Sequence, residues 1–295
     1  RRPPISTPLY SSAASDVYKR QIVLEEISAG SGSMGIIVSG HNAVGCMPIL
    51  QFGTQSQKDT YLRPFARGEQ LTAFALTEPA GGSDVAKLRT RAERRNDRYI
   101  LNGTKQFITS GSTADVALIF ATTDPDAPRG KGISGFIVPT DAPGYTVDRI
   151  ENKMGLKASD TCVISLDAVE VPFENRLGEE GQGYKIALSN LEGGRIGIGA
   201  QAIGIARAAL EAALDYARER HTFGVPISDH QAVAFRLADM ATELEAARQL
   251  VFYAARLKDD GQPSLRQASM AKLKATEMAE SVCSDAIQIL SLIHI

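Results

Sequence analysis

The segment of this 295-residue chain best suited to chemistry runs from Ala75 to Asp84 and reads Ala-Leu-Thr-Glu-Pro-Ala-Gly-Gly-Ser-Asp. Gly81 and Gly82 allow backbone amides to approach a ligand closely, because neither residue carries a Cβ atom. Thr77 and Ser83 place hydroxyl groups beside those amides, and such a nest can hold an anion or the edge of a flavin ring. A glycine-rich turn with capping residues has the same composition, so these residues alone leave both interpretations open.

Four other segments combine glycine with basic, aromatic or hydroxyl side chains: Lys105-Gln-Phe-Ile-Thr-Ser-Gly111, Lys153-Met-Gly-Leu-Lys-Ala-Ser159, Glu192-Gly-Gly-Arg-Ile-Gly197, and Arg220-His-Thr-Phe-Gly224 with His230-Gln231. Each also has an ordinary structural interpretation. Phe107 would be a strand aromatic of the core, and Ser159 would close a turn. Arg220 would stabilise a helix C-terminus through the macrodipole.

The histidines and cysteines do not form a metal site or a nucleophile arrangement. His221 and His230 have no carboxylate or cysteine partners at metal-ligand spacing, so we assign no metal. Cys46, Cys162 and Cys283 are far apart in the sequence, which argues against a disulfide scaffold or a zinc site. We interpret them as small buried residues in a reducing compartment, with the cytoplasm as the default location.

The composition is that of a soluble globular protein of about two domains. Hydrophobic residues make up 43% and charged residues 22%, and the net charge is −2. This balance gives no global field for nucleic acid or an anionic membrane, so neither partner is expected. The apolar stretches are expected to be interrupted by charge before they reach membrane-spanning length.

The elements that must position these segments change type twice. Residues from Ile22 to about Gly68 predict helices, one over Ile22–Ala43 and a short one capped by Ser56 that ends before Pro64. Seven β-rich runs follow: Leu71–Thr77, Arg89–Arg94, Arg98–Thr109, Val116–Thr122, Ile133–Pro139, Tyr145–Ile150 and Thr161–Val171. They are punctuated by turn residues: Asn96-Asp97, Asn102-Gly103, Pro125-Asp126 and Pro143-Gly144. No helix separates the runs, which predicts a largely antiparallel barrel or sandwich.

After Gly183 the helical period returns. One apolar seam follows a long helix from Asp229 to Lys258: Val233, Leu237, Met240, Leu244, Ala247, Val251 and Ala254. A second seam after Pro263 consists of Ala271, Ala275, Met278, Val282 and Ile289. The fold class is therefore α+β: N-terminal helices over 22–70, an antiparallel β domain over 71–176 and a four-helix-bundle-type domain over 177–290.

The two ends of the chain are expected to be foreign. Residues 1–21 show neither a helical nor a strand period, and they resemble adapter read-through in translated metagenomic fragments, as do residues 291–295. Fold reasoning excludes both tails.

The five segments, in this order, resemble the acyl-CoA dehydrogenase family, and in particular its short-chain or branched short-chain members. The matches are TEPxxGSD at Thr77–Asp84, KxxI(T/S) from Lys105, KxG…S from Lys153, the start of the first bundle helix at Glu192, and RxxFG…Q from Arg220. The resemblance covers the chain from Ile22 to Leu290. The resemblance implies that fold, truncated at both ends, with FAD as cofactor.

Carried over by position, the resemblance implies two sets of ligand contacts. The residues that would contact FAD are Phe74, Leu76, Thr77, Gly82, Ser83, Phe107, Ile108, Thr109, Arg220, Thr222, Phe223, Gln231 and Gln288. Thr109 would offer a hydrogen bond near N5 of the flavin. In the family, the residues matched by Arg220, Thr222, Phe223, Gln231 and Gln288 contact the FAD of a neighbouring subunit. The resemblance therefore implies a homo-oligomer, a dimer of dimers. The residues that would contact acyl-CoA are Ser83, Ser159, Glu192 and Arg195.

The implied reaction is FAD-dependent α,β-dehydrogenation of an acyl-CoA to the trans-2-enoyl-CoA, in fatty-acid β-oxidation or branched-chain amino-acid catabolism. An electron-transfer flavoprotein is the implied electron acceptor. The family places its catalytic glutamate either at the position of Gly194 or beyond a motif that would follow Leu290. Glu192, two residues before Gly194, would point about 200° away on a helix. The base is thus expected beyond residue 290, and this chain is expected not to turn over acyl-CoA.

Three alternatives share the fold. An acyl-CoA oxidase would pass electrons to oxygen, and a non-catalytic flavoprotein would bind FAD without being reduced by any acyl-CoA. Some relatives bind DNA, but the net charge of −2 counts against that alternative.

Overall fold

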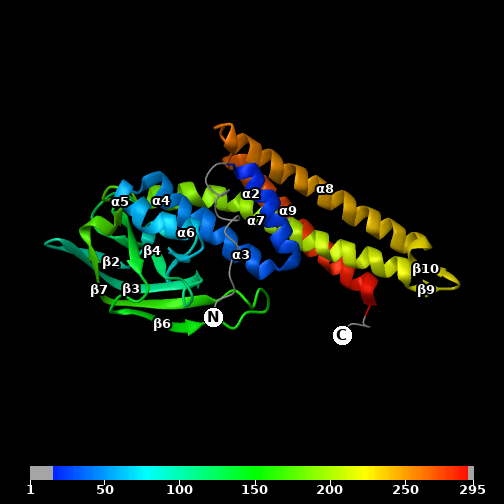
Figure 1. Ribbon diagram of the computed structural model, residues 1–295, viewed down its shortest axis with the longest axis horizontal. Helices are drawn as coiled ribbons and strands as arrows, with labels where there is room; N and C mark the ends of the chain where they lie inside the picture. Colours follow the sequence, from blue (N-terminus) through cyan, green and yellow to red (C-terminus); the bar gives the residue numbers. More distant parts are fainter. Residues whose placement is uncertain (1–15, 292–295) are drawn as a thin grey trace. The chain divides into compact units, whose positions relative to one another are not determined.

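The computed structural model describes residues 16–291, which Figure 1 shows as a ribbon coloured along the chain. Most of the two tails expected to be foreign lies outside these residues. The chain forms two compact units, one holding Ile37–Gly194 and the other the described parts of Ser15–Ile36 and Arg195–Ile295. The second unit thus joins the first described helix to the last ones. The expected domains 22–70, 71–176 and 177–290 are continuous stretches of sequence, and their boundaries stay a prediction.

The described chain opens with helical segments in the order α2 (Val17–Gly30), α3 (Gly32–Gly40), a π-helical stretch His41–Cys46, α4 (Met47–Phe52), α5 (Gln55–Gln57), a second π-helical stretch Lys58–Leu62 and α6 (Arg63–Ala66). The expectation of one helix over 22–43 is wrong, because the extended backbone of Ser31 ends α2. Helix α2 also begins earlier than expected, at Val17, where the Asp16 side chain accepts a hydrogen bond from Lys19 N–H. Residues 17–21 are therefore helical.

The short helix expected near Pro64 differs at both ends. Thr54 caps it rather than Ser56: the Thr54 hydroxyl accepts the Gln57 N–H at 3.2 Å, and the Gln57 side chain accepts the Thr54 N–H at 3.0 Å. The helix then continues through Pro64 to Ala66. The turn before the proline is π-helical, and its wider backbone leaves room for a ring that clashes with the carbonyl four residues back in an α-helix.

Eight strands form one sheet, in the order β6-β7-β3-β2-β4-β5-β8 with β1 paired to β4. Their bounds are β1 (Thr72–Ala75), β2 (Arg91–Arg95), β3 (Arg98–Thr109), β4 (Val116–Thr122), β5 (Ile133–Pro139), β6 (Tyr145–Ile150), β7 (Thr161–Pro172) and β8 (Arg176–Leu177). The pairings are antiparallel apart from β1–β4 and the single β2–β4 pair. The expected antiparallel sheet is confirmed, and β3 to β6 have the bounds that the sequence predicts.

Strand β4 is buried on both faces and joins two hydrophobic clusters. Leu118 and Phe120 pack with residues of α4, α6 and the start of α7 (Gly183–Glu219). Ile119 and Ala121 pack with residues of β1, β3, β5 and β7. Strands from distant places in the sheet order thus share one cluster, so the sheet curves around it as a barrel or sandwich does.

Two irregularities interrupt the pairing of β3 with β7. The first lies at Asn102, between the pairs Leu101–Val169 and Gly103–Leu166. The sequence predicts a turn at Asn102 and Gly103, but both residues lie inside β3. Asn102 Oδ1 accepts the N–H of Ala168 on β7 at 2.8 Å. Gly103 has a φ of +151°, and a Cβ there would lie 2.5 Å from Thr90 Oγ1. Two turn-forming residues thus serve here at a β-bulge and at a close approach between two segments of the backbone.

The second unit contains α2, most of α7, α8 (Gln231–Asp259) and α9 (Leu265–Leu290), and in Figure 1 α8 and α9 run side by side. Both expected seams are confirmed: apart from Val233, which is half-buried, their residues are buried. Glu25 of α2 is buried and pairs with Arg248 of α8 at 3.0 Å. A Cβ on Gly204 would lie 2.2 Å from Glu25 O, so α7 and α2 touch through their backbones.

Two helical stretches are long and apolar enough to span a membrane by length and composition, Gly32–Phe52 and Gly183–Glu219. The expectation that charge interrupts every such stretch is therefore wrong, since residues 32–52 contain no Asp, Glu, Lys or Arg. In the structure 61% and 56% of these windows are buried. That degree of burial is typical of core helices, which are apolar for packing reasons.

His41 is buried where the first π-helical stretch meets β1. Its Nδ1 accepts the Thr72 N–H at 3.2 Å, and its Nε2 lies 3.3 Å from Phe65 O. The ring must therefore carry its proton on Nε2 to donate to that carbonyl. Burial lowers the pKa of His41 to about 4, although the bond to Phe65 opposes this shift.

We expect the neutral state of His41 to make the stability of the chain depend on pH. The unfolded chain binds a proton on His41 below about pH 6.5, whereas the folded chain does not until about pH 4. The unfolding free energy of wild type minus that of His41→Gln should therefore decrease by about 3 kcal/mol as the pH is lowered from about 6.5 to about 4. Urea denaturation of both proteins across this range measures it, because the other titrations cancel in the difference. A difference that stays constant with pH would contradict this assignment.

Candidate functional site

The glycine-rich turn after β1 is held against β3 by backbone hydrogen bonds. Gln106 N–H donates to Thr77 O at 2.9 Å. Glu78 and Gly81 exchange N–H···O bonds of 3.1 and 3.0 Å, which close the turn. Gly82 is exposed, and a Cβ there would lie 3.3 Å from Thr77 Cγ2. The turn thus presents open backbone and, at the next residue, the exposed hydroxyl of Ser83.

Beside this turn, a β-bulge in β3 directs Phe107 outward. Gln106 and Phe107 together face one residue of β7, Val163. Phe107 has a φ of 59°, a conformation that costs a residue with a side chain about 1–2 kcal/mol, and its side chain is 60% exposed. The next residue, Ile108, is only 1% exposed. A strained backbone that exposes an aromatic ring beside an open turn indicates a ligand-facing position, so the interpretation of Phe107 as a core residue is wrong.

A buried ion pair lies behind the turn and the bulge. Lys105 Nζ donates to Glu78 Oε1 at 2.8 Å and to Leu76 O at 3.2 Å. Glu78 also accepts the backbone N–H groups of Arg89, at 2.6 Å, and Thr90, at 3.0 Å. The side chains of Lys105 and Glu78 are 0% and 4% exposed. Removing one partner of such a pair costs about 3–5 kcal/mol, because it leaves a buried charge uncompensated.

The pKa shifts of this pair are consistent with two charges at neutral pH. Burial would raise the pKa of Glu78, but the charge and hydrogen bond of Lys105, with the bonds from residues 89 and 90, outweigh it and hold the pKa below its ordinary value. Burial lowers the pKa of Lys105 to about 8, and the attraction of Glu78 opposes the shift. Lys105 therefore stays mostly protonated at pH 7.

Thr109 is the last residue of β3, and Ser159 lies two residues before the start of β7, which pairs with β3. Thr109 pairs with Thr161 of β7, and Ser110 N–H donates to Asp160 O at 3.2 Å. The Ser159 hydroxyl is buried and has no hydrogen-bond partner among the described residues. A buried hydroxyl without a partner is consistent with a ligand contact, because buried polar groups are normally paired.

In the second unit, four of the predicted residues surround one hairpin. Strands β9 (His221–Thr222) and β10 (Val225–Pro226) are joined by Phe223 and Gly224, which both have positive φ. Phe223 is 98% exposed at the tip. Thr222 Oγ1 lies 2.9 Å from His230 Nε2, and the His230 ring meets Phe223 edge-on. Arg220 and Gln231, at either side of the hairpin, are exposed.

The other predicted residues are distributed over the core, α7 and α9. Leu76 is buried in the cluster with α4 and α6, against which Phe74 packs; a ligand would meet mainly the backbone of Leu76 and of Ile108. Glu192 is half-buried and Arg195 is exposed one turn further along α7; Gln288 is exposed on α9. At Gly194, a Cβ would meet only Val44, at 4.0 Å. This position has room for a side chain that the sequence does not supply.

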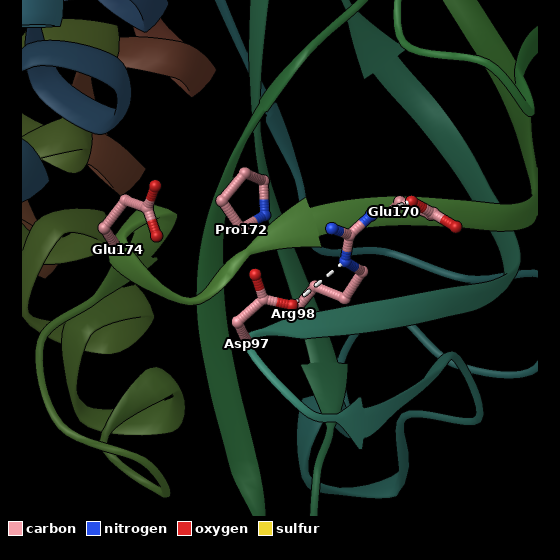
Figure 2. A pocket seen from close by; sticks show the side chains of 5 residues that line it. All are labelled: Asp97, Arg98, Glu170, Pro172 and Glu174. Carbon is pink, nitrogen blue, oxygen red and sulfur yellow. Dashed lines mark hydrogen bonds and ion pairs between the residues drawn. The ribbon is translucent and has the colours of Figure 1, made fainter.

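A cavity of about 360 Å³ lies at the opposite end of β3 and does not belong to this site. Its lining residues are Asp97, Arg98, Glu170, Pro172 and Glu174, which Figure 2 shows around the Arg98 side chain. Arg98 pairs with both Asp97 and Glu170, so its charge is already matched. The cavity surface is left with an excess of carboxylates.

The Lys105–Glu78 pair and the bulge at Gln106 and Phe107 are the features that the sequence does not reveal. Both ionic partners occur in the motifs quoted above, but the sequence separation of 27 residues hides their contact. A lysine at an inward position of a strand is the one signal that could have identified it.

The fold and the site define a class of α+β proteins in which a β domain lies between two helical segments of the chain. The structure of butyryl-CoA dehydrogenase from Megasphaera elsdenii shares this fold with a TM-score of 0.92 and 42% identity, over 94% of this chain and 72% of that chain. Models of the N-terminal, middle and C-terminal domains of acyl-CoA dehydrogenase match residues 8–69, 73–169 and 181–292. The chain therefore belongs to the acyl-CoA dehydrogenase family, and the predicted family and fold class are confirmed.

Two further relatives are similar over most of this chain. An acyl-CoA dehydrogenase of Bacillus subtilis is 50% identical over 280 residues, which cover 95% of this chain and 74% of that protein. A glutaryl-CoA dehydrogenase of Mycobacterium smegmatis, in complex with FADH2, is 35% identical with a TM-score of 0.90, over 97% of this chain and 72% of that chain.

The strain at Phe107 is tested by comparing alanine with glycine at this position. Because only glycine adopts a positive φ without a Cβ penalty, Phe107→Gly should be more stable than Phe107→Ala by about 1 kcal/mol. At Gln106, which is not among the residues with positive φ, alanine should be the more stable of the two. Urea unfolding of the four variants measures both orders. The same order at both positions would contradict strain at Phe107.

Proposed function

We propose that this chain binds FAD and a short-chain acyl-CoA and serves the α,β-dehydrogenation of that acyl-CoA to the trans-2-enoyl-CoA. The observation that carries the proposal is the exposed, strained Phe107 beside the open turn at Gly82, in a chain of this family. The relatives named above are all acyl-CoA dehydrogenases, which favours this reaction over that of an oxidase.

The residues around the bulge are suited to hold a flavin. Phe107 offers an aromatic face, Gly82 and Ser83 offer exposed backbone and a hydroxyl, and the Thr109 hydroxyl is half-buried at the end of β3. When bound, FAD supplies the acceptor for the β-hydride at its N5 atom. In this proposal Thr77 and Thr109 hydrogen-bond the ring, and the backbone of Phe74, Leu76 and Ile108 completes the contact.

For acyl-CoA we propose contacts with Ser83, Ser159, Glu192 and Arg195. Arg195 is exposed and carries a fixed positive charge that attracts the anionic CoA. The Ser159 hydroxyl is buried without a partner among the described residues, so a ligand acceptor would satisfy it. We assign the α-proton base to no described residue, because Gly194 carries no side chain and Glu192 lies on a different face of the helix.

We also propose that the FAD site is completed by a second copy of this chain. Arg220, Phe223, Gln231 and Gln288 are exposed, and an aromatic ring that is 98% exposed at a hairpin tip is suited to meet a partner molecule. With Thr222 they would contact the FAD of the neighbouring subunit in a dimer of dimers. An electron-transfer flavoprotein would accept the electrons, in cytoplasmic fatty-acid or branched-chain amino-acid breakdown.

The proposal predicts that the purified chain binds FAD through Phe107. Phe107→Ala should weaken FAD binding at least about tenfold, because it removes a stacking face. Ile150→Ala, at a residue of the same sheet with 56% exposure, should bind FAD as the wild type does. Quenching of FAD fluorescence gives both dissociation constants.

Addition of butyryl-CoA to the FAD-loaded chain should then shift the visible flavin spectrum, and Arg195→Gln should weaken this response. A wild-type chain that does not bind FAD, or FAD-loaded protein that does not respond to any acyl-CoA, would overturn the proposed function.

A further inference from the structure

We propose that the Glu78–Lys105 ion pair is a positioning device that sets the turn after β1 and the β3 bulge at the correct spacing for the flavin. This role rests on the proposed function. Neither side chain is accessible, with 4% and 0% exposure, so neither can touch a bound molecule from its place behind the surface. The pair acts through the residues beside it.

The pair connects the two segments proposed to face the flavin. Glu78 directly follows Thr77, and Lys105 lies two residues before Phe107. Lys105 Nζ holds the turn at two points, Glu78 Oε1 and Leu76 O, and Gln106 N–H adds a third link at Thr77 O. The distance between the open turn and the exposed ring is therefore set by three hydrogen bonds, two of which come from one ammonium group.

A carboxylate is required at position 78 because it accepts from several donors at once. Oε1 accepts Lys105 Nζ and the Thr90 N–H, while Oε2 accepts the Arg89 N–H. A neutral amide would place an NH2 group against one of these N–H donors. The negative charge therefore fixes the orientation of the turn as well as its distance from β3.

The glycine at position 103 supports this arrangement. Gly103 lies on β3 two residues before Lys105, and a Cβ there would come within 2.5 Å of Thr90 Oγ1 and 2.7 Å of Thr90 Cα. The segment with Arg89 and Thr90 thus lies directly against β3. This close approach brings its N–H groups within reach of Glu78.

The test uses Lys105→Met, Glu78→Gln and the double variant in the full chain. Each single variant leaves one buried charge or donor set uncompensated and should lower the unfolding midpoint. The double variant has no uncompensated charge and should recover most of the stability. It still lacks the donor to Leu76 O and the full acceptor set for residues 89 and 90, so the turn should stay loose.

Two measurements on the double variant separate positioning from a merely structural role. Amide hydrogen exchange at Gln106 and Gly81, in the protein without FAD, should be at least about tenfold faster than in the wild type. The FAD dissociation constant should rise at least about tenfold. The control is Arg98→Met/Glu170→Gln, which removes an exposed ion pair at the other end of β3 and should change neither quantity.

A double variant with wild-type exchange at these amides, or with wild-type FAD affinity, would overturn the inference and leave the proposed function intact. Failure of the wild-type chain to bind FAD would overturn both.

Discussion

A carboxylate inside a protein must be surrounded by donors, and the candidate site depends on how this chain satisfies that constraint at Glu78. The donors come from two separate segments, residues 89–90 and Lys105, which are not neighbours in the sequence. Their convergence fixes the exit of β1, the approach to β2 and the middle of β3 relative to one another. An apolar side chain at position 78 would permit many packings of the turn, whereas a buried charge permits one that satisfies its partners.

The bulge in β3 determines which side chains the strand exposes. Tyr99, Leu101 and Lys105 lie at even spacing along β3, so they share one face of the strand, and all three are buried. If the alternation continued, Phe107 would enter the core. The extra residue in the bulge reverses the phase, so Ile108 enters the core and Phe107 faces outward. A single inserted residue thereby converts a core strand into one edge of a ligand site.

Local patterns predict most of the fold, and tertiary contacts account for the rest. The bounds of β3 to β6 and the seams of α8 and α9 follow from periods of two and 3.6 residues, which the packing of this chain respects. The cap at Thr54, the break at Ser31 and the passage through Pro64 depend on which of several suitable residues the backbone uses. Asn102 and Gly103 have turn chemistry, but their contacts with Ala168 and Thr90 use it for a bulge and a close approach.

The candidate site divides in the same way. The motifs identify the residues that the structure places around the bulge and the hairpin. They do not show that Phe107 is strained, that Ser159 has an orphan hydroxyl or that Lys105 and Glu78 form a pair. Each of these properties arises from residues distant in the sequence, and no pattern along one segment contains that information.

The second unit is discontinuous in the sequence, and this affects the order in which parts of the chain fold during synthesis. The first N–H groups of α2 bind the Asp259 side chain, 242 residues later for Val17, and Glu25 needs Arg248. At ribosomal rates of roughly 5–20 residues per second, α2 waits on the order of ten seconds or more for these partners. Until Arg248 and Asp259 have been synthesised, Glu25 and the first N–H groups of α2 lack these partners, and a 14-residue helix on its own is only marginally stable in water. Folding of this unit is therefore a late event with high contact order, whereas the β domain can form its sheet as it emerges from the ribosome.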